Sequence, residues 1–235
     1  MENNRATAKY VTDSAIADAQ REFLTKVYSW MVGALLLTAG AAWYTFMNNW
    51  DLALINSGIY WGVIIAQFGV VIWLSGWVER MQKNTAIMAF LGYSLLTGVT
   101  FSVILRAFTS ESIYTVFLIT AGMFAALSFY GFTAKKDLSG VGKFMFMGLV
   151  GIIIATIVNF FILSSAMHFV ISCVGVVVFA GLTAYDTQKL KEMYSVMAEG
   201  DEMATKFAIR GALALYLDFI NLFLFLLRLF GGSRD

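Results

Sequence analysis

Two aspartates stand out because they lie inside apolar stretches long enough to cross a membrane. Of the 15 acidic residues, the other 13 fall in polar connections, at the chain ends or at the edges of such stretches. Asp218 lies within Leu215–Asn221, and Asp186 lies at the end of a run that begins at Met167. An aspartate at the centre of a membrane helix costs about 2.5 to 3.5 kcal/mol, so it usually faces a bundle interior, where it pairs, titrates or lines a water path.

Each aspartate also has a purely structural explanation. Asp218 could be a hydrogen-bonding residue that joins helices, and Asp186 could be an interfacial residue beside Lys189. The helical rise places Asp186 about 28 Å along its helix from Met167, and Asp218 about 10 Å from a helix start at Gly211. Both then lie in the same half of the membrane, so contact between them is geometrically possible.

The chemistry expected of such a pair is proton and cation binding. Two carboxylates that approach one another in a low-dielectric site share a proton and titrate together, because both cannot stay charged. A hard cation such as Ca²⁺ can replace the shared proton. If Asp186 and Asp218 approach one another, we therefore expect them to respond to pH near neutrality and to be able to bind Ca²⁺ weakly. Arg80 is the best-placed compensating charge, although an ordinary anchoring role at the membrane surface explains it as well.

Membrane-spanning helices must position these residues. The chain is 60% hydrophobic and only 13% charged, with a mean hydropathy of +0.76, which leaves too little polar surface for a soluble domain. Seven stretches have the roughly 20 apolar residues that a span needs, the last only if Asp218 and Arg228 are accepted within it. They are Val27–Met47, Ile59–Val78, Thr85–Leu105, Ile113–Phe132, Phe144–Leu163, Met167–Tyr185 and Gly211–Phe230. The expected fold is an all-α integral membrane bundle of seven helices over 27–235, after a polar cytoplasmic tail over 1–26.

The charges of the connections predict the orientation of the bundle. If the seven stretches alternate in direction, 13 of the 16 Lys and Arg residues fall on the side of the N-terminus. Such an excess marks the cytoplasmic side, so we expect a cytoplasmic N-terminus. Seven full spans would place the C-terminus outside, whereas a re-entrant last segment would return Arg228 and Arg234 to the cytoplasm. The sequence leaves both arrangements open.

Several function classes are disfavoured. A net charge of +1 with no basic face argues against a nucleic-acid partner. No His or Cys cluster and no glycine-rich phosphate loop is found, so we expect no bound cofactor. Intramembrane aspartyl proteases also use two aspartates, but in a Gly-x-Gly-Asp motif and with a proline-containing motif nearby. Here Asp218 follows Leu-Tyr-Leu, and the chain has no proline, so we expect no enzyme. The intramembrane amides Gln67, Asn159 and Asn221 are expected to join helices by hydrogen bonds.

Three segments resemble motifs of the Bax inhibitor-1 family, also called the transmembrane Bax inhibitor motif family. They are Gly181–Gln188 (Gly-Leu-Thr-Ala-Tyr-Asp-Thr-Gln), Leu215–Phe223 (Leu-Tyr-Leu-Asp-Phe-Ile-Asn-Leu-Phe) and Ala134–Ser139 (Ala-Lys-Lys-Asp-Leu-Ser). The resemblance extends from the first span onward and is closest to bacterial inner-membrane members. It implies a bundle whose last helix is surrounded by the other six, in a bacterial inner (cytoplasmic) membrane.

The resemblance also implies a function. It implies a pH-sensitive calcium leak, with the lipid bilayer, Ca²⁺ and protons as partners and Ca²⁺ as the transported ion. The governing aspartate pair matches Asp186 and Asp218, and a latching arginine matches Arg80. The alternative that it permits is a non-conducting interaction protein that modulates a membrane-bound AAA protease. The polar segment Met1–Arg21 would then contact the protease.

Overall fold

The computed structural model describes residues 2–193, 200–232 and 234, with side chains from residue 14 onward. The described chain is helical, without strands, and contains seven helices long and apolar enough to cross a membrane. In order they are α1 (Glu2–Met47), α3 (Ile59–Trp77), α4 (Lys83–Ala107), α5 (Ser110–Thr133), α6 (Ser139–Ile162), α7 (Ser165–Glu192) and α8 (Asp201–Phe230). A short helix α2 (Trp50–Asn56) follows α1, and a 3-10 turn η1 (Val78–Arg80) ends α3. The predicted seven-helix membrane bundle is confirmed.

Several helices extend beyond the predicted spans. α7 continues to Glu192, and α8 begins at Asp201, ten residues before Gly211. α1 begins well before residue 26, and the side chains of Phe23 and Leu24 are buried in the bundle. Hydrophobicity marks the part of a helix that lies in lipid, whereas the polar turns beyond it follow from hydrogen bonding and packing.

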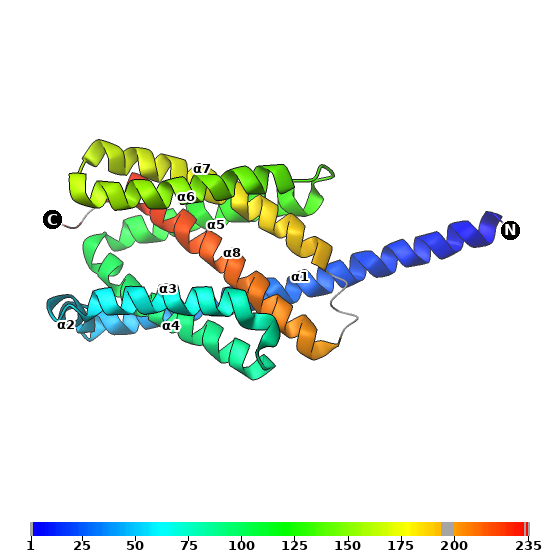
Figure 1. Cartoon of the computed structure of the whole chain (residues 1–235), viewed down its shortest axis with the longest axis horizontal. Helices are drawn as coiled ribbons and strands as arrows, with labels where there is room; N and C mark the ends of the chain where they lie inside the picture. Colours follow the sequence, from blue (N-terminus) through cyan, green and yellow to red (C-terminus); the bar gives the residue numbers. More distant parts are fainter. Residues whose placement is uncertain (1, 194–199, 233, 235) are drawn as a thin grey trace.

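α8 is the central helix. It contacts α1, α3, α4, α5 and α7, whereas α6 packs mainly on α7. Figure 1 shows α8 running obliquely between α6 and α7 on one side and α1, α3 and α4 on the other. Apart from Asp218 and Asn221 it is apolar on nearly every face around its middle, and Leu215, Tyr216 and Leu222 are fully inaccessible there. A helix that is hydrophobic all round is stable only when it is surrounded.

The two ends of the chain lie at opposite ends of the bundle (Figure 1). After α8, the backbone N–H of Arg234 donates to the carbonyl of Ala107 at 2.9 Å, and that of Thr109 donates to Gly232 at 3.1 Å. The C-terminal residues are therefore attached to the connection between α4 and α5. α8 crosses the whole bundle, and the re-entrant alternative is wrong.

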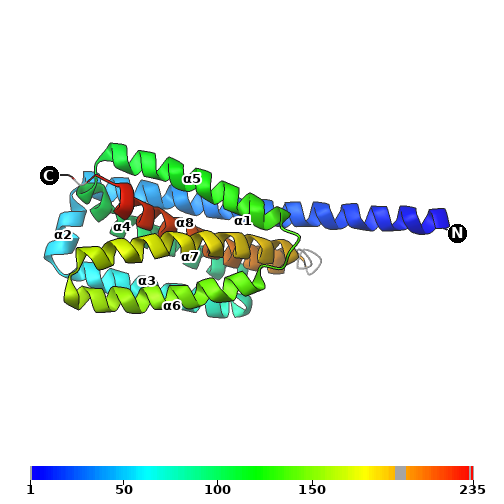
Figure 2. The ribbon, with the colours of Figure 1, turned by 90° about the horizontal axis from the view of Figure 1, so that it is seen from above.

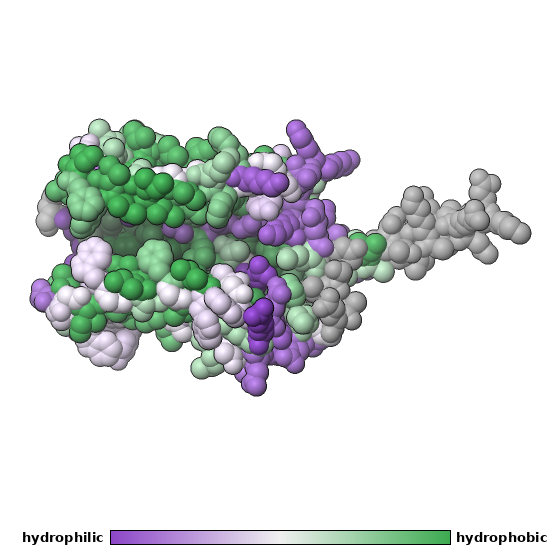
Figure 3. All heavy atoms as spheres, in the orientation of Figure 1, coloured by the Kyte–Doolittle hydropathy of each residue, from purple (hydrophilic) through white to green (hydrophobic). Residues whose placement is uncertain are grey.

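Polar and apolar surfaces are segregated. Hydrophobic residues cover the visible side of the bundle, and hydrophilic residues gather at the end from which α1 projects (Figure 3). This is the distribution expected of a protein whose sides contact lipid.

The three intramembrane amides behave differently from one another. Gln67 on α3 donates to the hydroxyls of Thr97 and Thr100 on α4, at 3.4 and 3.2 Å, so its predicted interhelical role is confirmed. Asn221 donates to the carbonyl of its own helix at Leu217, and the Asn159 carbonyl accepts from the backbone just after α6. For these two the prediction is wrong, because only the local backbone bonds to the Asn221 amide and the Asn159 carbonyl, and the Asn159 amide nitrogen is buried without a partner among the described residues.

Candidate functional site

Asp218 lies in the interior of the bundle. Its residue is only 4% exposed, and Oδ2 is buried without a hydrogen-bond partner among the residues that the structure describes. The flanking α8 residues Leu215, Phe219 and Leu222 are buried apolar side chains. An unpartnered oxygen of this kind is costly, because water no longer solvates it and no donor replaces the water. Such a group is rare in folded proteins and calls for a proton or a cation.

The antiparallel packing of α7 and α8 sets the position of Asp186 relative to Asp218. A methyl carbon at Gly211 would lie 2.5 Å from the Leu190 side chain, and one at Gly175 would lie 2.6 Å from the Phe225 ring. These two close approaches place residue 186 opposite about residue 215. Asp218 is then about one helical turn, or roughly 4.5 Å, farther along α8.

The two aspartates interact through their charges but are not hydrogen-bonded to each other. Asp186, which is half-buried, exerts a Coulomb interaction on Asp218. Lys189, one turn farther along α7, in turn acts on the charge of Asp186. No hydrogen bond joins the two carboxylates among the described side chains, so the directly shared proton expected from the sequence is not found, and the two groups influence one another through charge alone. The two aspartates are therefore in different environments: Asp218 is deeply buried, and Asp186 lies near the Lys189 ammonium group.

The pair alone does not make a complete metal site. Among the described residues, no three His, Cys, Asp or Glu side chains converge as a metal-binding group. Calcium takes six to eight oxygen ligands, so two carboxylates can at most hold it weakly, with water completing its shell.

Arg80 is not brought to the aspartates in the described state. Its side chain is exposed at the end of η1, and no ion pair joins it to either carboxylate in the described part of the chain. Lys206 and Arg210 of α8 attach this turn instead. Lys206 donates to the carbonyls of Met81 and Glu79 at 3.1 and 3.4 Å, and Arg210 binds the Glu79 carboxylate at 2.7 Å.

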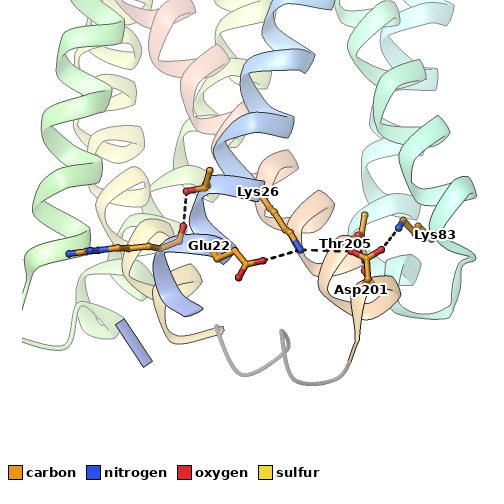
Figure 4. Close-up of polar contacts among 7 residues, drawn as sticks. Glu22, Lys26, Lys83, Asp201 and Thr205 are labelled. Carbon is orange, nitrogen blue, oxygen red and sulfur yellow. Dashed lines mark hydrogen bonds and ion pairs between the residues drawn. The ribbon is translucent and has the colours of Figure 1, made fainter. Parts of the chain in front are cut away.

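A second set of ion pairs holds the beginning of α8 (Figure 4). The Asp201 carboxylate binds Lys83 of α4 at 2.5 Å and Lys26 of α1 at 3.8 Å. Lys26 also lies 3.6 Å from Glu22. These side chains are substantially exposed, so each pair adds little free energy, but together they link α1, α4 and α8 at the charged end of the bundle.

Gln188 was missed by the sequence analysis, although it lies in a recognised motif. Its amide donates to the carbonyls of Lys136 and Ala134 at 2.9 and 3.4 Å, and its carbonyl accepts from the Leu138 backbone at 2.7 Å. The two motif segments 134–139 and 181–188 therefore contact one another. This connection fixes α7, and with it Asp186, against the turn between α5 and α6.

The opposite end of the bundle contains another charged pair that was not predicted. The fully buried carboxylate of Asp51 in α2 binds the guanidinium of Arg106 at the end of α4, which also donates to Asn49 at 3.0 Å. The hydrogen bond from Arg106 holds the pKa of Asp51 below its ordinary value. Arg106 also lies over the Phe46 ring at 5.0 Å. The pair joins α2 to α4.

Comparisons with known proteins agree with this architecture. Residues 20–235 match the family described as "Inhibitor of apoptosis-promoting Bax1". The chain is 47% identical to the inner membrane protein YbhL of Escherichia coli over 215 residues, covering 90% of this chain and 92% of that protein. It is 43% identical to an uncharacterized protein of Deinococcus radiodurans, covering 96% of each chain. It is 45% identical to an uncharacterized protein of Borreliella burgdorferi, covering 92% of this chain and 94% of the other. The chain is an integral membrane protein and belongs to the Bax inhibitor-1 family.

Proposed function

We propose that this protein is a pH-sensitive calcium leak path, gated by the Asp186–Asp218 pair and captured here in a closed state. The observation that carries the proposal is the buried, unpartnered Oδ2 of Asp218, on a central helix and within electrostatic reach of a second carboxylate. A passive path of this kind involves no enzymatic reaction. The family resemblance supports the choice of calcium as the ion.

The physical basis of gating is charge repulsion between neighbouring helices. When both carboxylates are ionised they repel each other, and either α7 and α8 shift or a cation enters between them. When one carboxylate holds a proton, the repulsion disappears and tight packing is favoured. A change in proton occupancy therefore shifts the equilibrium between closed and open states. Because only two carboxylates are available, the bound ion leaves readily, as conduction requires.

Two observations support a closed state: the aspartates line neither of the two cavities described next, and Asp218 is deeply buried. A cavity of about 530 Å³ lies between α1 and α5 and is lined in part by Arg21, Tyr28 and Phe132. A second, of about 840 Å³, lies at the far end of the bundle against α2 and is lined in part by Trp50. Neither cavity is lined by Asp186 or Asp218. The deep position of Asp218 is likewise that of a group closed off from water.

The proposal is tested with purified protein in liposomes that contain a calcium dye, at external pH from about 6 to about 8. We expect Asp218→Asn and Asp186→Asn each to remove the pH dependence of calcium entry, because an amide cannot exchange the proton. Asp18→Asn is the matched control, since Asp18 is an exposed aspartate on α1 and lies outside both motif segments. Flux that is unchanged in both membrane variants would contradict the proposal.

Arg80 enters the proposal as a residue that acts in another state. With its side chain exposed, it pairs with the ionised carboxylates only after η1 moves toward them. The Lys206 and Arg210 contacts hold η1 in place. Arg80→Gln should therefore alter calcium entry in liposomes while leaving thermal stability in detergent near wild type. Wild-type flux in Arg80→Gln would remove Arg80 from the gating site.

The excess of Lys and Arg at the end where α1 begins supports a cytoplasmic N-terminus. α1 continues far beyond the other helices there (Figures 1 and 2), which gives a second proposal, contact with a cytoplasmic partner such as a membrane-bound AAA protease. Deleting residues 2–13 should abolish co-purification with that protease and leave liposome flux intact. Co-purification that survives the deletion would exclude residues 2–13 as the contact.

A further inference from the structure

The side of α8 away from α7 carries a buried hydroxyl contact to α1. The hydroxyl of Tyr216 lies 2.7 Å from that of Thr38. The Thr38 oxygen is also 2.9 Å from the carbonyl of Ala34 and 3.0 Å from that of Ser94 on α4. A threonine hydroxyl has one proton, which these two carbonyls attract, so Tyr216 donates to Thr38. This hydrogen bond therefore attaches the middle of α8 to the α1–α4 pair.

The acceptor is held rigidly. α1 and α4 approach so closely beside Thr38 that a methyl carbon at Gly98 would lie 2.5 Å from the Thr38 carbonyl oxygen. The Tyr216 ring is fully buried and meets the rings of Phe90 and Tyr93 edge to face, each at 6.0 Å between centroids. Thr38 therefore cannot follow Tyr216 if α8 turns.

Tyr216 and Asp218 lie on opposite sides of the same helix. Two residues of separation correspond to a rotation of about 200° around an α-helix. Tyr216 accordingly contacts α1 and α4, whereas Asp218 interacts with Asp186 on α7. A rotation of α8 that brings Asp218 to water or to a cation must pull the Tyr216 hydroxyl from Thr38.

We propose that the Tyr216–Thr38 hydrogen bond holds α8 in the closed orientation and so regulates access to Asp218. The expected effect on calcium flux rests on the proposed calcium path. The accessibility of Asp218 can be measured whether or not the protein conducts calcium. The loss of one buried neutral hydrogen bond from only one of two states changes their ratio by about fivefold.

Calcium flux is the first test. Tyr216→Phe retains the ring and removes only the hydroxyl, so we expect about fivefold more flux under conditions in which the wild type is closed. Thr38→Val should do the same, and Thr38→Ser, which keeps the hydroxyl, should behave as wild type. The double variant Tyr216→Phe/Thr38→Val should exceed neither single variant. Thr120→Val is the matched control, because in the described part of the chain that buried hydroxyl bonds only to the carbonyl of Val116 in its own helix.

The second test measures the access of Asp218 directly. A membrane-permeant carbodiimide reacts with accessible protonated carboxyl groups, and mass spectrometry gives the labelled fraction of Asp218. Labelling should rise about fivefold in Tyr216→Phe and Thr38→Val, and not in Thr38→Ser or Thr120→Val. Unchanged labelling in both Tyr216→Phe and Thr38→Val would overturn the inference. If labelling rises in the two variants but the wild-type protein passes no calcium in liposomes, the hydrogen bond's role is supported and the calcium path is refuted.

Discussion

Arg106 at the end of α4 neutralises Asp51, a carboxylate with no exposed surface, at the end of the bundle opposite the N-terminus. The pair connects α2 to α4 through two carboxylate oxygens. It is the most completely buried acidic group in an ion pair among the described residues, and it lies far along the chain from either proposed gating aspartate.

Removing the cation should leave this buried charge uncompensated. We expect Arg106→Met to lower the free energy of unfolding by more than the removal of an exposed cation does, because the inaccessible Asp51 carboxylate loses the group that compensates its charge. The measurement is thermal or denaturant unfolding of the purified protein in detergent. Lys26→Met is the control, since its ion pairs with Glu22 and Asp201 are exposed and it should change stability by less than about 1 kcal/mol. Equal effects of the two substitutions would contradict a special role for the buried pair.

The same pair should give a defined pH dependence of stability. Arg106 holds the pKa of folded Asp51 below its ordinary value of 3.8. The stabilisation is therefore present above the unfolded pKa and is lost as the pH falls through the folded pKa. The difference in melting temperature between wild type and Asp51→Asn should stay constant from about pH 7 to about pH 5 and shrink below about pH 4. A difference that grows on acidification would have the wrong sign.

Gly131 of α5 should tolerate no side chain. A methyl carbon there would lie 2.2 Å from the backbone oxygen of Ala184 on α7, two residues before Asp186. Gly131→Ala should therefore destabilise the bundle by about 2 kcal/mol, because neither backbone can move without losing packing. Gly122→Ala on the same helix is the matched control, since nothing lies within 4 Å of that position. Comparable melting temperatures for the two variants would show that α5 and α7 do not pack this closely.

Lys206 should contribute more stability than the exposed lysines near it. Its residue is 7% exposed, and its ammonium group donates to two carbonyls of the turn between α3 and α4. We expect Lys206→Met to cost about 2 kcal/mol, as for other charged hydrogen bonds, whereas Lys83→Met should cost less than about 1 kcal/mol. Unfolding measurements in one detergent compare the two. A larger effect of Lys83→Met would reverse the roles assigned here.

The sequence predicted the spans well because hydrophobic length is a direct physical requirement of the bilayer. It also predicted that Asp218 is buried, because an aspartate in an apolar run has no other favourable place. It did not predict Gln188, Tyr216 or Thr38 as connecting residues. Their contacts join positions up to 178 residues apart, and a tyrosine or threonine in an apolar helix has several inexpensive alternatives.

Charged residues at the helix ends were predictable as a group but not individually. Arg80, Lys206 and Arg210 all follow from the excess of positive charge on one side. Which of these side chains faces inward depends on how each helix is rotated and on where the turn η1 lies. No hydrophobic pattern in the sequence indicates the rotation or the turn. The exposure of the Arg80 side chain therefore could not be predicted from the sequence.

The central claim is that Asp186 and Asp218 act as one unit in controlling calcium entry. The most direct measurement is a double-mutant cycle of pH-dependent calcium flux in liposomes, with Asp186→Asn, Asp218→Asn and both together. If the pair is a unit, each single substitution removes the pH dependence and the double variant equals either single variant. Additive effects of the two substitutions, or a pH dependence that survives in the double variant, would contradict the claim.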